Sequence, residues 1–225
     1  MNCRRHWTTY NRILLEIPDQ YRYEAQVLFS LLAFSTRPIS LSEAAEAVAI
    51  DLKKGTFDLQ NRLFDPGSIL KICSTLVSIS QFETKLHYWD DGSKELRFAH
   101  YSIKEYLLSK RAPPVFQINE NNAHDLIARL GLTYLLSMSS LSPTSVTQQA
   151  LPFLLYASEY SHVHNVKVTQ LNKDCTVRLI LALFLMRHMK PNFASRSWRG
   201  IQNVCILYYL SYLVSSYLVS ITHRY

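Results

Sequence analysis

The sequence has 225 residues, of which 48% are apolar and 18% charged, and its formal net charge is +7. This composition can build a sizeable hydrophobic core and is unlike that of a disordered chain. The five glycines are far apart, which excludes the P-loop, the dinucleotide-binding fingerprint and the nucleophile elbow of serine hydrolases: they are Gly55, Gly67, Gly92, Gly131 and Gly200.

Cysteine usage and the N-terminus indicate the compartment. The four cysteines are far apart, and three lie in apolar helical patterns, as is typical of buried thiols in a reducing environment: Cys3, Cys73, Cys175 and Cys205. The first residues, MNCRRHWTTYNR, include basic side chains with no apolar stretch after them, so we expect no signal peptide. The protein is therefore expected to be cytoplasmic.

Two short helices are expected after a lead-in segment, residues 1–19. The first begins near Asp19 and ends before Pro38. One of its faces is apolar, with residues at helical spacing: Ala25, Leu28, Phe29 and Leu32. Ser40 and Glu43 form an S-x-x-E capping box, which predicts the start of the second helix.

A third helix and two strands are expected next, after a polar loop. Asp65 is the predicted N-cap of this helix, with Pro66 at its first position. The first strand is expected near residues 76–80 or 85–89, and the second at 95–100, with a turn at Asp90-Asp91-Gly92-Ser93. Three short helices followed by a hairpin is the order of elements in a winged helix.

The segment LRFAHYSIKEYLLSK, residues 96–110, changes its periodicity at His100. Apolar residues alternate before that position and recur at helical spacing after it. Ser102 and Glu105 predict a capping box for the new helix. A histidine at a strand-to-helix junction lies just ahead of a helix N-terminus, where anions are favoured. On these residues alone, His100 is either a polar turn residue or an anion-binding side chain.

Part of this segment, FAHYSIKEYLLS, resembles the F-x-H-x-S-x-x-E-(Y/F)-L motif that closes the winged helix of NACHT-type signalling ATPases. It is most similar to fungal members with ankyrin repeats, whose domain is called the winged helix of the GPI inositol-deacylase type. TYNRILLEIP at residues 9–18, AHDLIARLGLTYLLS at 123–137 and LPFLLYASEYSHVH at 151–164 are also similar to that family. The resemblance therefore extends over residues 8–165.

The resemblance implies a role for His100. In that family the histidine at this place reaches the phosphates of bound ADP and helps to hold a closed, inactive state. It implies the same for His100 only when a NACHT nucleotide-binding domain supplies the rest of the pocket. We therefore expect a non-catalytic regulatory module that couples nucleotide state to C-terminal ankyrin repeats. No cofactor is expected in this chain itself, and the deacylase in the domain's name implies no such activity.

The sequence KRAPP, residues 110–114, is the expected boundary between a winged-helix domain at 20–112 and a helical arm at 115–198. Residues 199–225 are expected to form an apolar helical tail. The predicted fold class is thus mainly α with a small β-hairpin, a winged helix followed by a helical bundle or arm.

The arm is expected to contain three helices. Asn122 is the expected cap of the first, which has an apolar stripe through Met138. The second is expected from about Gln148, with Pro152 in its first turn, and the third at 174–190.

Three alternative interpretations concern the C-terminal stretch, DNA binding and metal binding. Residues 200–222 carry no formal charge, so a tail-anchored membrane fragment competes with a truncated first ankyrin-like unit, although polar residues disfavour a membrane span. A stand-alone DNA-binding winged helix is disfavoured because Lys71 is the only basic residue of the helix at 66–76. His162 and His164 are too far around a helix to hold one metal ion together, so structural roles are expected.

Overall fold

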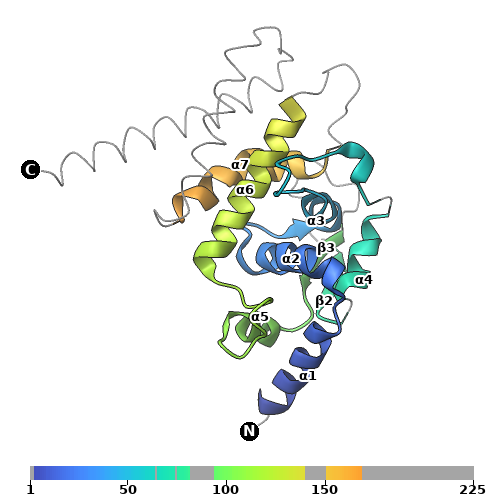
Figure 1. The fold of residues 1–225 in the computed structure, drawn as a ribbon, viewed down its shortest axis with the longest axis vertical. Coiled ribbons are helices and arrows are strands. Elements are labelled where there is room, and N and C mark those ends of the chain that lie inside the picture. The colour runs from blue at the N-terminus through green and yellow to red at the C-terminus, as the bar shows by residue number, and fades with distance from the viewer. Residues whose placement is uncertain (1–2, 64, 74, 82–93, 140–150, 169–225) are drawn as a thin grey trace, which may run out of the picture.

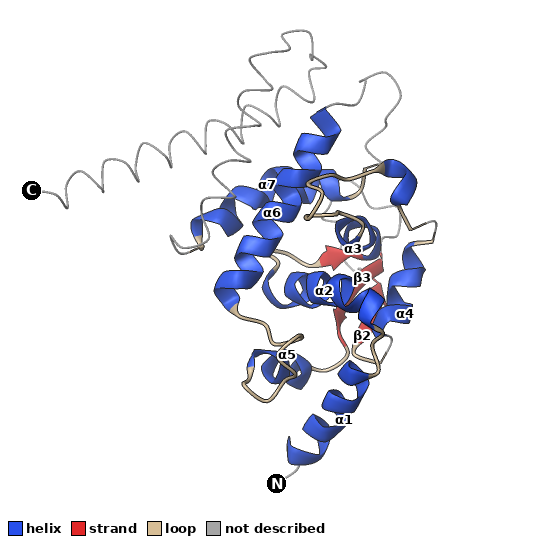
Figure 2. Cartoon of the chain, viewed as in Figure 1, coloured by secondary structure: helices blue, strands red, loops and turns tan. Residues whose placement is uncertain are grey.

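In the residues that the structure describes, the fold is mainly helical and contains one small sheet (Figure 1 and Figure 2). The computed structural model describes residues 3–63, 65–73, 75–81, 94–139 and 151–168. In chain order, its helices and strands are α1 Cys3–Leu15, α2 Arg22–Phe34, β1 Ile39–Ser40, α3 Leu41–Val48, α4 Leu70–Cys73, β2 Val77–Gln81, β3 Lys94–Phe98, α5 Tyr101–Leu108, α6 Glu120–Ser139 and α7 Phe153–Val166. This order confirms the predicted fold class.

The sheet is antiparallel, with the strand order β1-β3-β2, so that β3 lies in its centre. Leu96 of β3 is opposite both Ile39 of β1 and Ile79 of β2. Of the two positions expected for the first strand of the hairpin, β2 confirms the one near 76–80. The alternative at 85–89 and the turn at 90–93 lie outside the described residues. The short strand β1 was not predicted.

Local sequence signals explain how two of the helices begin. The capping box of α3 is present, since Glu43 N–H donates to Ser40 Oγ at 3.1 Å and Ser40 N–H donates to Glu43 Oε2 at 2.9 Å. Asp65 Oδ1 accepts a hydrogen bond from Gly67 N–H at 2.9 Å, as predicted for a cap. The helix it caps begins with a 3₁₀ turn, Pro66–Ile69, before α4.

Other helices differ from the expectation. The lead-in segment contains α1, which no pattern had indicated. The cap of α6 is Asn119 and not Asn122, because Asn119 Oδ1 accepts from the N–H groups of Asn121 at 2.9 Å and Asn122 at 3.3 Å. In the described residues α7 begins at Phe153, while the expected start near Gln148 lies outside them.

One hydrophobic core extends from the end of α1 into α7. Its members include Leu14 of α1, Phe29 of α2, Leu96 of β3, Tyr134 of α6 and Tyr156 of α7. α6 packs on α2 and crosses α7, and α7 also contacts α3, as Figure 1 shows. The helices of the arm therefore share their apolar interior with the winged helix.

The membrane alternative concerned the uncharged stretch at 200–222. That stretch, like the expected third arm helix at 174–190, lies outside the described residues. Within the part of the chain that the structure describes, no helix is long and apolar enough to cross a membrane.

Candidate functional site

His100 lies at the junction where β3 leads into α5. Its backbone is extended, with φ −150° and ψ 144°, and its Nδ1 accepts a hydrogen bond from Ser102 N–H at 3.2 Å. His100 is therefore itself the N-cap. The predicted capping box of Ser102 and Glu105 is wrong, because the imidazole takes the capping position and α5 begins at Tyr101, ahead of Ser102.

The capping contact determines how the neutral ring carries its proton. Because Nδ1 accepts the N–H of Ser102, the proton of neutral His100 is on Nε2. The ring is exposed and lies 4.4 Å from the ring of Tyr101, measured between centroids. Tyr101 is itself 72% exposed. An N–H donor beside an exposed aromatic ring is thus presented at this edge of the fold.

Lys104, two residues after Ser102 on α5, packs against α2. Lys104 Nζ donates to the carbonyl oxygen of Ala33 at 2.5 Å and lies 5.2 Å from the centre of the Phe34 ring. The ammonium group of Lys104 therefore links α5 to α2. By contrast, Glu105 is exposed to solvent.

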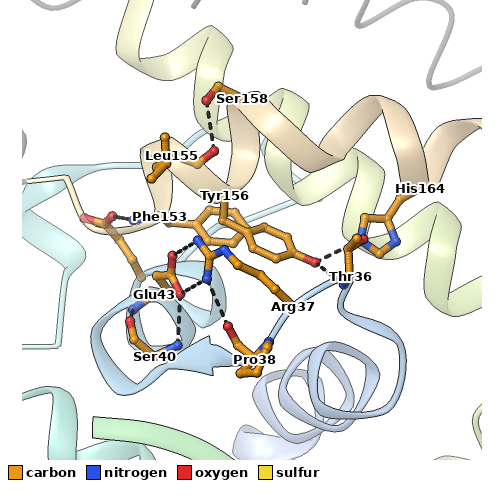
Figure 3. A network of polar contacts seen from close by, with 11 residues as sticks. Thr36, Arg37, Pro38, Ser40, Glu43, Phe153, Leu155, Tyr156, Ser158 and His164 are labelled. Atoms are coloured by element: carbon orange, nitrogen blue, oxygen red, sulfur yellow. Dashed lines mark hydrogen bonds and ion pairs between the residues drawn. The ribbon is translucent and has the colours of Figure 1, made fainter. Parts of the chain in front are cut away.

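A second group of polar side chains lies between α3 and α7 (Figure 3). The Arg37 guanidinium binds both oxygens of the Glu43 carboxylate, at 2.9 and 2.5 Å. It also lies over the rings of Tyr156 and Tyr160, at 5.1 and 5.7 Å from their centres. This planar, charged contact joins the winged helix to the arm.

His164, one of the two histidines singled out in the sequence, is fully buried beside this contact. Its Nε2 is 2.9 Å from the Tyr156 hydroxyl, and its Nδ1 is 2.7 Å from Nδ1 of His124. A consistent assignment has Tyr156 O–H donating to Nε2 and His164 Nδ1–H donating to His124, with both rings neutral. Among the described residues, no group of three or more histidine, cysteine or acidic side chains could hold a metal ion.

Burial explains the acid–base behaviour of this pair. Desolvation, followed by the proximity of His124, lowers the pKa of His164 to about 3. Desolvation also lowers the pKa of His124, and Lys167 lowers it further. The pKa of His162 is lowered by desolvation as well. His124 and His164 are therefore neutral hydrogen-bonding groups of the core.

Glu46 of α3 forms a third buried polar contact, which the sequence did not reveal. Its carboxylate accepts from the Tyr134 hydroxyl at 2.5 Å, from Phe153 N–H at 2.8 Å and from the Arg62 guanidinium. Desolvation raises its pKa, and the hydrogen bonds from Tyr134, Phe153 and Arg62 oppose that effect. Like the Arg37 contact, it holds the arm against the winged helix.

In a winged helix that binds DNA, α4 would enter the groove, so the surface beside α4 would form the nucleic-acid interface. Lys71 is exposed there and lines an open groove of about 690 Å³ together with Lys53. The same groove is lined by the acidic residues Glu24 and Asp51. A lining of both signs does not provide the uniformly positive track that a phosphate backbone requires.

Two comparisons found known proteins with similar sequences. The family model described as "GPI inositol-deacylase, winged helix domain" matches residues 14–119. The chain is 32% identical over 167 residues to the azaphilone pigments biosynthesis cluster protein L of Monascus ruber, over 70% of this chain and 34% of that protein. It thus spans about a third of the length of this relative. No solved structure matches.

Proposed function

Because the family model of the GPI inositol-deacylase winged helix domain matches residues 14–119, we propose that the chain is a non-catalytic regulatory module of a NACHT-type signalling ATPase. Its partners are then the NACHT domain and the C-terminal ankyrin repeats of such a protein, and its compartment is the cytoplasm. The exposed His100 carries the proposal, since it occupies the histidine position of the F-x-H-x-S-x-x-E motif.

The geometry of His100 suits a phosphate oxygen. With Nδ1 occupied by the N-cap contact, the ring presents Nε2–H outward as a donor, and phosphate oxygens are strong acceptors. In the proposed closed state this donor contacts the phosphates of ADP held by the NACHT domain. The contact is absent in the open state, so ADP favours the closed one.

The buried contacts described above supply a route from the sensor to the repeats. The Arg37 guanidinium, over two rings of α7, and the Glu46 carboxylate bind the arm to the winged helix, and the arm and the winged helix share one core. A displacement at the His100 edge is then passed on through α6 and α7 toward the C-terminal part of the protein. The match covers a third of the Monascus ruber relative, in which this segment is one part of a longer chain.

The test joins a NACHT domain of the family to the N-terminus of this chain and measures ADP binding by calorimetry. His100→Asn is the informative variant, because asparagine keeps the N-cap of α5 while removing the Nε2–H donor. This variant is expected to weaken ADP binding about ten- to a hundredfold. That is the effect of losing one hydrogen bond to a charged group, which contributes about 1.5–3 kcal/mol.

The matched control is Glu105→Gln, an exposed change on the same helix, which should leave ADP affinity as it is. The chain without the NACHT domain is expected to bind no ADP. An ADP affinity that is equal in the His100→Asn and unmodified fusions would overturn the sensing role.

A further inference from the structure

A hydrogen-bonded chain connects α1 to the ring of His100. The Tyr10 hydroxyl of α1 is 2.8 Å from Ser102 Oγ, and Ser102 Oγ is 2.6 Å from His100 Nδ1. We propose that Tyr10 is a positioning residue for His100, so that docking of α1 on α5 regulates the sensor. The inference rests on the proposed function of His100.

The direction of the hydrogen bonds follows from the cap. His100 Nδ1 accepts the N–H of Ser102, so the Ser102 hydroxyl also donates its proton to Nδ1. The Ser102 oxygen then accepts the proton of Tyr10. This arrangement holds the neutral ring with its proton on Nε2 and facing outward. Without Tyr10, the buried hydroxyl of Ser102 can rotate toward a backbone carbonyl instead, and the orientation of the ring is less restricted.

α1 is attached unevenly. Its C-terminal end is anchored by Leu14, which is fully buried in the core. Its N-terminal part lies on α5 through aromatic contacts, with the ring centres of Trp7 and Tyr10 at 6.5 and 5.7 Å from that of Tyr106. Trp7 also lies 4.0 Å from the guanidinium of Arg111, just beyond the end of α5. A groove of about 530 Å³ opens between the two helices, lined by Trp7, Thr8, Asn11, Tyr106 and Arg111.

Trp7 and Tyr10 are only half-buried where they contact α5, and Thr8 and Thr9 between them are exposed. Separating the N-terminal part of α1 from α5 therefore exposes less apolar surface than separating the fully buried helices would. Figure 1 shows α1 extending away from the body of the fold next to α5. In the proposed complete protein the NACHT domain precedes α1. A movement of that domain therefore reaches His100 through Tyr10.

The experiment uses the chain as it is and needs no nucleotide. Long-range ¹⁵N–¹H NMR of the histidine rings reports the tautomer of each imidazole. The unmodified chain is expected to show His100 with its proton on Nε2. Tyr10→Phe and Ser102→Ala keep the Ser102 N–H on Nδ1 and therefore this tautomer, but they weaken or remove the second hydrogen bond to Nδ1. Both variants are expected to shift the His100 Nδ1 resonance, while Tyr21→Phe, which removes an exposed hydroxyl elsewhere, should not. Identical His100 signals in the Tyr10→Phe and unmodified chains would overturn the positioning role.

Failure of this inference is distinguishable from failure of the proposed function. In the NACHT fusion, Tyr10→Phe is expected to weaken ADP binding about two- to tenfold, which is the effect of losing one hydrogen bond between neutral groups. If the His100 Nδ1 resonance shifts but His100→Asn leaves ADP affinity unaltered, the positioning role stands and the sensing role fails. If the His100 Nδ1 resonance does not shift, only the positioning role is lost.

Discussion

At the scale of single residues, the buried His164 couples the stability of the fold to pH. Its pKa is lowered from 6.5 to about 3 by burial and by the neighbouring His124. Because the folded pKa lies below the unfolded one, the unfolded chain takes up the proton first as pH falls. The contribution to stability is complete above about pH 6.5 and is lost progressively toward pH 3. Between pH 7 and 5 this loss is expected to be about 2 kcal/mol.

Urea unfolding at pH 7 and pH 5 measures this effect. His164→Gln should reduce the difference between the two free energies of unfolding, because glutamine can still accept the Tyr156 hydroxyl but does not titrate. Lys71→Ala, a change at an exposed side chain that does not titrate between pH 5 and 7, keeps the buried pair and should retain the full difference. A His164→Gln chain with an undiminished pH dependence would contradict the prediction.

Residue by residue, the sequence predicted positions better than contacts. The change of period from two to helical spacing placed His100 correctly between a strand and a helix, because that signal is local. It did not indicate that His100 is the cap, since histidine is not among the usual capping residues. Glu46 gave no signal at all: its partners, Arg62, Tyr134 and Phe153, come from distant parts of the chain and meet only in the fold.

At the scale of elements, the crossing of α6 and α7 depends on Gly131. A Cβ atom at this position would lie 1.9 Å from Ser161 Oγ and 3.1 Å from Ser161 Cβ. Gly131→Ala is therefore expected to destabilise the fold by about 1–3 kcal/mol through overpacking, even though alanine favours a helix by about 1 kcal/mol.

A double-mutant cycle isolates the cause. Ser161→Ala removes the oxygen that the new Cβ would meet, so Gly131→Ala should be tolerated better in the Ser161→Ala background. Thermal unfolding of the four chains measures the coupling. Strictly additive changes in the free energy of unfolding would show that the two helices do not meet at this point.

The elements themselves were predictable where their signals are local and unambiguous. The capping box of Ser40 and Glu43 lies within four residues and was confirmed. At the start of α6 several asparagines follow one another closely, and spacing alone did not select Asn119. β1 has two residues and exists only because it pairs with β3, more than 50 residues further on. Such a strand has no pattern of its own.

At the scale of the whole molecule, the net charge of +7 is not expected to make the chain a DNA-binding protein. Lys53 and Lys71 share their groove with Glu24 and Asp51, which limits the number of phosphates that can be neutralised. Binding to random duplex DNA at physiological salt should be weaker than the ~10⁻⁴–10⁻⁶ M of non-specific binders. Fluorescence anisotropy measures it, with Lys71→Ala as the matched variant. Salt-dependent binding at low micromolar protein that is lost in Lys71→Ala would favour a DNA-binding function instead.

The strand order of the sheet also bears on how the protein is synthesised. Of the three strands that the structure describes, β3 is the last to leave the ribosome, yet it is the native partner of both β1 and β2. Until Lys94–Phe98 has emerged, the nascent chain holds two strands without their native neighbour, and Ile39 and Val77 lack the cover they have in the core. Translation that stops before Lys94 leaves those strands unpaired, so truncated products are expected to aggregate or to depend on chaperones.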